Sequence, residues 1–276
     1  MSADPIPGPA SPPSRDAIAA RLRAAGCVYA EEEADLLISA ARTPADLPGL
    51  VDRRAAGQPL EHVLGWAEFC GLRIAVDPAV FVPRRRTEFL AGQAIALARP
   101  GAVVVDLCCG SGALAAALAA AVDQAEVYAA DIDPAAVRCA RRNLAAAGGR
   151  VYEGDLFGAL PAALRGRVDL LLANVPYVPT GEVSLLPPEA RDHEARVALD
   201  GGPDGLGVLR RVAAGAAEWL VPGGHLLSEI SERQVAAATG AVTRAGLTAR
   251  VARSGEHGAT VLVGTWPSLR ASVRPG

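Results

Sequence analysis

The sequence predicts an α/β protein with a mostly parallel sheet, preceded by a small helical domain. The first observation is the segment Val103 to Ala119, VVVDLCCGSGALAAALA, in which a short β-branched strand leads through a glycine turn into an Ala/Leu-rich helix. The second is that the pattern then repeats. The strand-like run Glu126 to Ala130 is followed by a helix with Asp133 as its N-cap and Pro134 at its first position. Strands that alternate with helices favour a parallel sheet covered by helices.

The chain before this sheet divides into three parts. The first 14 residues contain five prolines and lack the pattern of a signal peptide, so we expect residues 1–14 to be a disordered leader. Residues 15–64 should form a helical domain that begins with three short helices, the third with Thr43 as its N-cap and Pro44 at N1. The alternating residues 65–82 predict a β-hairpin that links this domain to the sheet domain, residues 83–268, and residues 269–276 form a tail.

Composition excludes several functional classes. The net charge of −3 over 276 residues gives no bulk attraction to nucleic acid. All 27 basic residues are arginine, and none is lysine. The five cysteines form no C-x-x-C pair, so neither a metal site nor a disulfide framework is expected. Because no stretch approaches the ~20 apolar residues of a membrane span, we expect a cytoplasmic protein without a membrane partner.

The glycine turn has the features of a cofactor site. Asp106 ends the first strand, and Gly110 and Gly112 follow in a D-x-x-x-G-x-G spacing, whereas Ala115 replaces the third glycine of the dinucleotide pattern. Asp131 ends the next strand, where an acid can hydrogen-bond a ribose diol. The alternative is an ordinary strand-turn-helix unit with an incidental acid.

Asn174-Val175-Pro176-Tyr177, directly after the apolar run Val168 to Ala173, has the features of an acceptor site. An amide or exocyclic amine nitrogen is a poor nucleophile because its lone pair is delocalised. An Asn side-chain oxygen followed by a backbone carbonyl can accept both of its N–H groups, and an aromatic ring can stack on its plane. The alternative is a plain strand-to-loop exit, since Asn and Pro are common turn residues.

Together these residues resemble class I S-adenosyl-L-methionine-dependent methyltransferases, and in detail the release-factor glutamine N5-methyltransferase family, whose acceptor motif is Asn-Pro-Pro-Tyr. The resemblance covers nearly all of residues 50–265. Besides the two motifs, it includes RRAAGQPLEHVLGWAEFCG, FVPRRRTE (81–88), GDLF (154–157), ALDGGPDGL (198–206) and LVPGGHLLSEIS (220–231). It implies a Rossmann-like, seven-stranded methyltransferase sheet that ends in an antiparallel strand pair.

The resemblance also implies roles for individual residues. Asn174 and the Val175 carbonyl would hold the glutamine amide, Tyr177 would stack on it, and Pro176 would direct the Val175 carbonyl. Contacts to S-adenosyl-L-methionine would come from Thr87, Asp106, Cys108, Gly110, Gly112, Asp131, Ile132, Asp155, Leu156 and Asn174. The segment Thr180 to Ala198 would form a long loop over the acceptor site, and Glu229 matches a family acid for which we expect a structural role.

The expected partner is a protein substrate, a peptide chain release factor, recognised with help from the helical domain. The protein itself should be a monomer, and nucleic acid is not expected except through a ribosome-linked partner. The chain departs from the family in three places: Val175 stands for Pro, Cys108-Cys109 for Gly-Thr, and three arginines, 84–86, precede Thr87. Two alternatives remain: an N6-adenine or other nucleic-acid amino methyltransferase, which would need base flipping on duplexes, or a cofactor-binding homologue without activity.

Overall fold

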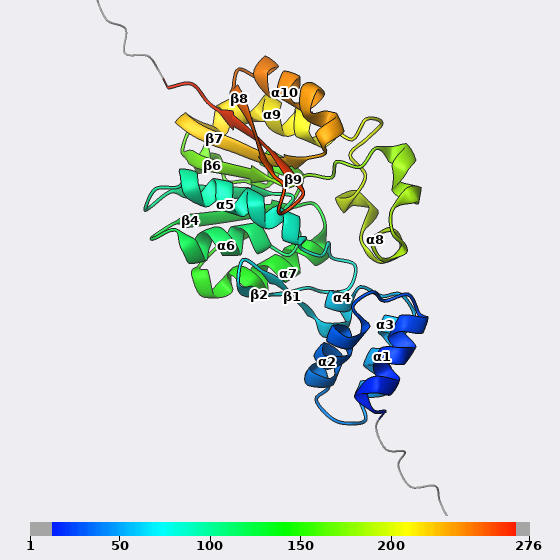
Figure 1. The fold of residues 1–276 in the computed structure, drawn as a ribbon. Coiled ribbons are helices and arrows are strands. Elements are labelled where there is room, and N and C mark those ends of the chain that lie inside the picture. Colours follow the sequence, from blue (N-terminus) through cyan, green and yellow to red (C-terminus); the bar gives the residue numbers. More distant parts are fainter. Residues whose placement is uncertain (1–12, 269–276) are drawn as a thin grey trace, which may run out of the picture. The chain divides into compact units, whose positions relative to one another are not determined.

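A computed structural model describes residues 13–268 (Figure 1). The chain divides into two compact units, with the boundary between Gly65 and Trp66. The expected leader, apart from Pro13 and Ser14, and the expected tail lie outside the described residues.

The described part of the first unit, residues 13–65, contains four helices: α1 (Arg15–Ala24), α2 (Ala30–Ala40), α3 (Leu47–Ala55) and α4 (Leu60–Leu64). Its small core is built around Ile18, Leu22 and Leu37. Next to that core the Arg54 guanidinium donates to both carboxylate oxygens of Glu33, at 2.6 and 2.9 Å, so a buried charge on α3 is matched by one on α2.

The predicted start of the third helix was wrong. The Thr43 N–H donates to Oδ2 of Asp46 at 2.9 Å and the Asp46 N–H donates back to the Thr43 carbonyl, so Thr43 to Asp46 form a closed turn. The helix begins only at Leu47, and Pro48 rather than Pro44 occupies its first turn. Pro44 and Pro48 each marked a possible helix start, and they lie four residues apart. The hydrogen bond from the Thr43 N–H to the Asp46 side chain favours the later start, because it closes a turn before the helix.

The second unit begins with a hairpin of β1 (Trp66–Phe69) and β2 (Leu72–Ala75), which pair antiparallel. The turn places Cys70 and Gly71 at φ 50° and 72°, a region that glycine adopts without strain. Asn143, on α7 (Pro134–Leu144), accepts from the Ala75 N–H and donates to its carbonyl, both at 2.9 Å. The hairpin is therefore held against the sheet domain through both backbone groups of one residue.

A seven-stranded sheet forms the centre of the second unit, in the order β5-β4-β3-β6-β7-β9-β8. The first five strands in this order run parallel to one another, whereas β9 runs antiparallel to both β7 and β8. The predicted α/β class with a mostly parallel seven-stranded sheet and an antiparallel pair at its end is confirmed. The strands are β3 (Val103–Leu107), β4 (Glu126–Asp131), β5 (Arg150–Glu153), β6 (Val168–Ala173), β7 (Leu220–Ile230), β8 (Thr248–Ser254) and β9 (Ala259–Thr265).

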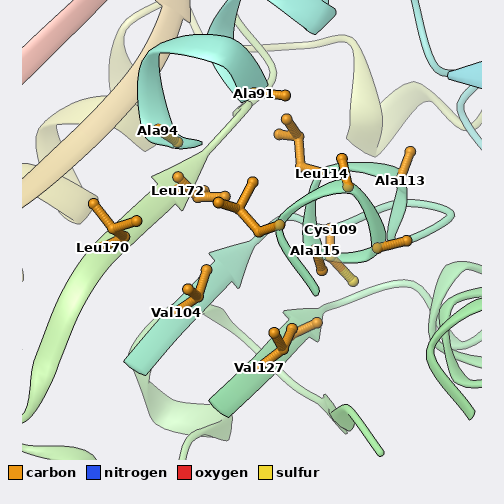
Figure 2. Close-up of a cluster of buried hydrophobic side chains, with 14 of the residues drawn as sticks. Ala91, Ala94, Val104, Cys109, Ala113, Leu114, Ala115, Val127, Leu170 and Leu172 are labelled. Carbon is orange, nitrogen blue, oxygen red and sulfur yellow. The ribbon is translucent and has the colours of Figure 1, made fainter. Parts of the chain in front are cut away.

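Helices cover both faces of this sheet (Figure 1). One face carries α5 (Glu88–Leu97), α6 (Ala113–Ala121) and α7, and the other carries α9 (Gly207–Trp219) and α10 (Val235–Arg244). Figure 2 shows the interface between the sheet and α6, where Val104 of β3 and Leu172 of β6 pack in the same cluster as Leu114 of α6. The strands are apolar on both faces because both are covered, as parallel sheets require.

The segment expected to be a long loop, Thr180 to Ala198, is partly helical. It contains α8 (Pro188–His193) between two short 3₁₀ turns, Thr180–Leu185 and Arg196–Ala198. Within residues 13–268, no helix is both long enough and apolar enough to span a membrane.

Candidate active site

A cavity of about 630 Å³ lies where β3, β4, β6 and β7 end at their carboxyl edge. Parallel strands bring their carboxyl ends to one edge of the sheet, which is where ligands bind in open α/β folds. Of the residues predicted for the site, the cavity wall includes Thr87, Asp106, Cys108, Gly110, Asp131, Ile132, Asn174, Val175, Pro176 and Tyr177. The two motifs, far apart in the sequence, therefore line one cavity.

The glycine turn between β3 and α6 exposes its backbone to this cavity. Cys108, Gly110 and Gly112 have φ values of 56°, 55° and 77°. At Gly110, the nearest atom to an added Cβ would be Phe81 Cβ at 3.9 Å, so the space beside it is open. Cys108 holds a left-handed conformation where glycine would be unstrained, a departure that costs about 1–2 kcal/mol.

Asp106 is buried at the end of β3, with 1% of its surface exposed. Its Oδ2 accepts from the Ala115 N–H at 3.2 Å, while its Oδ1 has no hydrogen-bond partner among residues 13–268. Burial raises the pKa of this carboxyl to about 8. An unpartnered carboxylate oxygen in a cavity wall is suited to a cationic amine.

Asp131 has a fixed orientation at the end of β4. Its Oδ2 accepts from the Gly110 N–H at 2.8 Å and its Oδ1 from the Asp133 N–H at 2.9 Å, while burial raises the pKa of its carboxyl. Each carboxylate oxygen has a further lone pair, so a vicinal diol can still be accepted. The turn, Asp106 and Asp131 thus fit a ligand that carries an ammonium group and a ribose.

Asn174, directly after β6, has a buried side-chain oxygen with no hydrogen-bond partner in the described part of the chain. A buried amide oxygen without a partner is costly unless a ligand supplies the donor. The next side chain, Val175, is 2% exposed and belongs to the core beneath α9. The motif therefore combines a buried, unpartnered acceptor on a residue of the cavity wall with an apolar side chain in the core.

The Tyr177 hydroxyl lies in a network of four side chains. It donates to Oε1 of Glu229 at 3.1 Å, and it accepts from Nη2 of Arg86. Glu229 also accepts from Nε of Arg86 at 2.8 Å and from the Thr87 hydroxyl at 2.7 Å. Burial, followed by the Glu229 charge, raises the pKa of Tyr177, so the phenol is neutral.

Residues of the segment 180–200 form another part of the cavity wall, and contacts at Glu194 and Ala195 hold this segment in place. The buried Glu194 carboxylate accepts from Nη2 of Arg84 at 2.6 and 2.7 Å and from the Val82 N–H at 3.2 Å. The Ala195 N–H donates to the Ala79 carbonyl at 3.0 Å. We call residues 180–200 the strap, since it joins the wall to the chain that precedes α5.

Three predicted cofactor residues lie outside the cavity wall: Gly112, Asp155 and Leu156. A Cβ at Gly112 would approach Ala140 Cβ at 3.1 Å, so this glycine allows close packing of α6 on α7. Asp155 is half exposed and pairs with Arg211 at 2.5 Å, and the Leu156 side chain is buried in the core beneath α9. Their roles toward the cofactor remain predictions.

Several wall residues had no assigned role in the sequence-based prediction. Phe69 and Phe81 line the cavity, as do Leu186 and Val197 of the strap. Phe81 and Arg84 to Arg86 stand in a segment that matched the family, but which arginine faces Tyr177 depends on tertiary structure. Among residues 13–268, no group of three or more His, Cys, Asp or Glu side chains could hold a metal ion.

Comparisons with known proteins show the family and the fold. The family model described as "Methyltransferase small domain" matches residues 74–202. Release factor glutamine methyltransferase of Geobacter sulfurreducens is 42% identical over 72% of this chain and 69% of its own, and that of Mycolicibacterium smegmatis is 44% identical over 71% and 70%. A 4-amino-L-phenylalanine/4-methylamino-L-phenylalanine methyltransferase of Streptomyces pristinaespiralis is 42% identical over 67% of this chain and 65% of its own.

Solved structures share the fold. A methyltransferase from Pyrococcus furiosus superimposes with a TM-score of 0.55 at 18% identity, over 71% of this chain and 90% of that one. The cofactor is S-adenosylmethionine, and Asp106, Asp131 and the glycine turn of the cavity wall are our candidates to hold it. The sheet is that of a Rossmann-like methyltransferase, and the proposed acceptor motif directly follows β6. The relatives share this identity over about two thirds of their length. We conclude that the chain belongs to the release factor glutamine methyltransferase family.

Proposed function

We propose that the protein transfers a methyl group from S-adenosylmethionine to the side-chain amide nitrogen of a glutamine in a peptide chain release factor. The observation that carries the proposal is the Asn174 side chain: the residue lines the cavity, and its buried oxygen has no hydrogen-bond partner among the described residues. It requires a donor, and a primary amide supplies one.

The acceptor motif would prepare the amide nitrogen for attack. Asn174 Oδ1 and the Val175 carbonyl accept its two N–H groups, and the Tyr177 ring holds its plane. The bound cofactor supplies a methyl group made electrophilic by a sulfonium. The residues contribute chiefly position and exclusion of water, and the amide proton leaves to solvent after transfer.

Val175 is compatible with this role. Among residues 13–268, the Val175 N–H donates no backbone hydrogen bond outside the regular elements. The fold therefore does not depend on this donor, which a proline at the same position would lack. Its side chain is buried in the core beneath α9, and Pro176 keeps the preceding residue extended. The carbonyl acceptor is retained, which favours an active enzyme over a homologue that only binds the cofactor.

The helical unit, residues 15–64, is our candidate for recognition of the protein substrate. The hairpin would connect it to residues 83–268, which we propose as the catalytic domain. We propose that the enzyme acts in the cytoplasm, where a release-factor substrate would be met, and that it acts as a monomer. Nucleic acid would be approached only through a ribosome-linked partner.

A second acceptor class follows from the relative in Streptomyces pristinaespiralis, whose name describes methylation of an aromatic amine. An arylamine, like an amide, presents a planar NH₂ to two acceptors and a ring. The decisive assay incubates the purified chain and Asn174→Ala with labelled cofactor. The acceptors are a release factor, 4-amino-L-phenylalanine and DNA, in separate reactions. Label on release-factor glutamine that Asn174→Ala abolishes supports the proposal. Label confined to the arylamine or to DNA overturns it.

A further inference from the structure

The acceptor motif is braced from the neighbouring strand by Glu229. In the parallel pair β6–β7, Leu172 lies opposite Leu227. Two residues beyond each of these partners stand Asn174 and Glu229, and side chains two residues apart point to the same face. The register therefore brings Glu229 level with the start of the acceptor motif, although 55 residues separate the two positions.

Glu229 is fully engaged although it is buried. Its side chain is 4% exposed, and three donors reach its two oxygens: Arg86 and Tyr177 at Oε1, and Thr87 at Oε2. A buried carboxylate is costly unless it is paired and hydrogen-bonded. Arg86, the last of the three arginines, supplies the countercharge. The arginine run thus has a specific role at the motif in place of a solvated patch.

The ring of Tyr177 is held at two points. Its hydroxyl lies between Glu229 and Arg86, and the Arg86 guanidinium carbon lies 5.8 Å from the ring centroid. A tyrosine side chain has two main rotations, and fixing the hydroxyl restricts both. A ring that must present one face to an amide plane benefits from this restriction, because small misplacements of a reacting group cost up to about 10²-fold in rate.

We propose that Glu229 is a positioning residue for methyl transfer, which acts through the Tyr177 hydroxyl and is neutralised by Arg86. This inference rests on the proposed function, since it assigns a residue to the same acceptor site. In this role Glu229 would contact neither the acceptor nor the transferred methyl group. Its effect should therefore disappear when the Tyr177 hydroxyl is removed.

A double-mutant cycle tests this dependence. Glu229→Gln should lower kcat for the release-factor substrate about tenfold, the equivalent of one charge-assisted hydrogen bond, while calorimetric affinity for S-adenosylmethionine stays within about twofold. Tyr177→Phe should lower kcat by a similar factor, and the double variant should be no slower than Tyr177→Phe alone. Equal losses from Glu229→Gln in both backgrounds, or no loss at all, would overturn the proposal.

Asp169→Asn is the matched control. It makes the same acid-to-amide change at the opposite end of β6, where the carboxylate accepts from the Val103 N–H at 2.9 Å. Its kcat should equal that of the wild type even if its melting temperature falls, which separates positioning from general stability.

A spectroscopic readout keeps the inference separate from the proposed function. The chain has four tyrosines, so a ¹³C-tyrosine-labelled sample gives few ring signals, and Tyr177→Phe identifies one of them. That signal should move in Glu229→Gln and stay in place in Asp169→Asn. If the wild type methylates no glutamine but the signal moves as expected, the proposed function fails and the positioning of Tyr177 by Glu229 is retained. If Glu229→Gln leaves the Tyr177 signal unchanged, positioning by Glu229 is overturned, whatever the activity.

Discussion

At the scale of single residues, two of the buried side-chain oxygens without a hydrogen-bond partner among residues 13–268 belong to the cavity wall. Asp106 Oδ1 lies at the end of β3, and Asn174 Oδ1 lies directly after β6 in the proposed acceptor motif. The sequence indicated both residues, because each directly follows or ends an apolar strand. It could not show that their oxygens lack partners, since that depends on every side chain around them.

Asn174→Ala should reduce methyl transfer without weakening cofactor binding. The lost acceptor matters more as the nitrogen gains positive character, so by analogy with removal of one oxyanion-hole donor kcat should fall about 10²- to 10³-fold. Steady-state kinetics and calorimetry with S-adenosylmethionine measure the two effects. Wild-type turnover in this variant would reduce the motif to a loop exit.

Cofactor binding should release a proton from Asp106. With a pKa of about 8, the carboxyl of the free protein is neutral at about pH 6.5, whereas the cofactor ammonium, ordinarily charged below about 7.7, favours the ionised form. Calorimetry in two buffers of different ionisation enthalpy should show release approaching one proton per cofactor. Asp106→Asn should release none, and equal release by both proteins would place the ammonium elsewhere.

The same pKa determines how stability depends on pH. Because burial raises the pKa of Asp106 from 3.8 to about 8, the folded chain retains a proton that the unfolded chain loses. The contribution of Asp106 is therefore present below the ordinary value and is lost as pH rises through about 8. The melting temperature of the cofactor-free wild type should fall across this window more steeply than that of Asp106→Asn.

At the scale of elements, the strap depends on one buried carboxylate. Glu194 joins it to Arg84 and to the backbone of Val82, so both sides of the cavity wall meet at a single side chain. The sequence suggested a loop over the acceptor site, but the two adjacent prolines and mixed charges concealed α8 and the ion pair. A partner 110 residues away leaves no local pattern.

Glu194→Gln should loosen the strap. Loss of a charge-assisted pair costs about 1.5–3 kcal/mol, and the lower end is expected because Arg84 is one-third exposed. Tryptic cleavage after Arg191 and Arg196 should accelerate about tenfold. Glu182→Gln, the same change at a half-exposed position of the strap, serves as the control. Identical cleavage of both variants would show that the backbone bond between Ala195 and Ala79 is sufficient.

At the scale of the whole molecule, charge distinguishes a protein substrate from a nucleic acid. The net charge of −3 predicts that activity depends weakly on salt. Neutralisation of about six phosphates would instead give a loss on the order of 10³-fold between about 50 and 200 mM salt. Initial rates across that range measure this, and a steep decline would favour the nucleic-acid alternative.

The sequence by itself determined the sheet, the glycine turn, the acceptor motif and the family, because each of these depends on contiguous residues whose spacing is local. Tertiary structure decided what faces the cavity. It turned Asp155 toward Arg211, placed Arg86 and Glu229 on Tyr177, and set Val175 in the core. The physical reason is distance along the chain: Arg86 and Glu229 are 143 residues apart, and only the register of neighbouring strands and the packing of the helices between them bring such groups into contact.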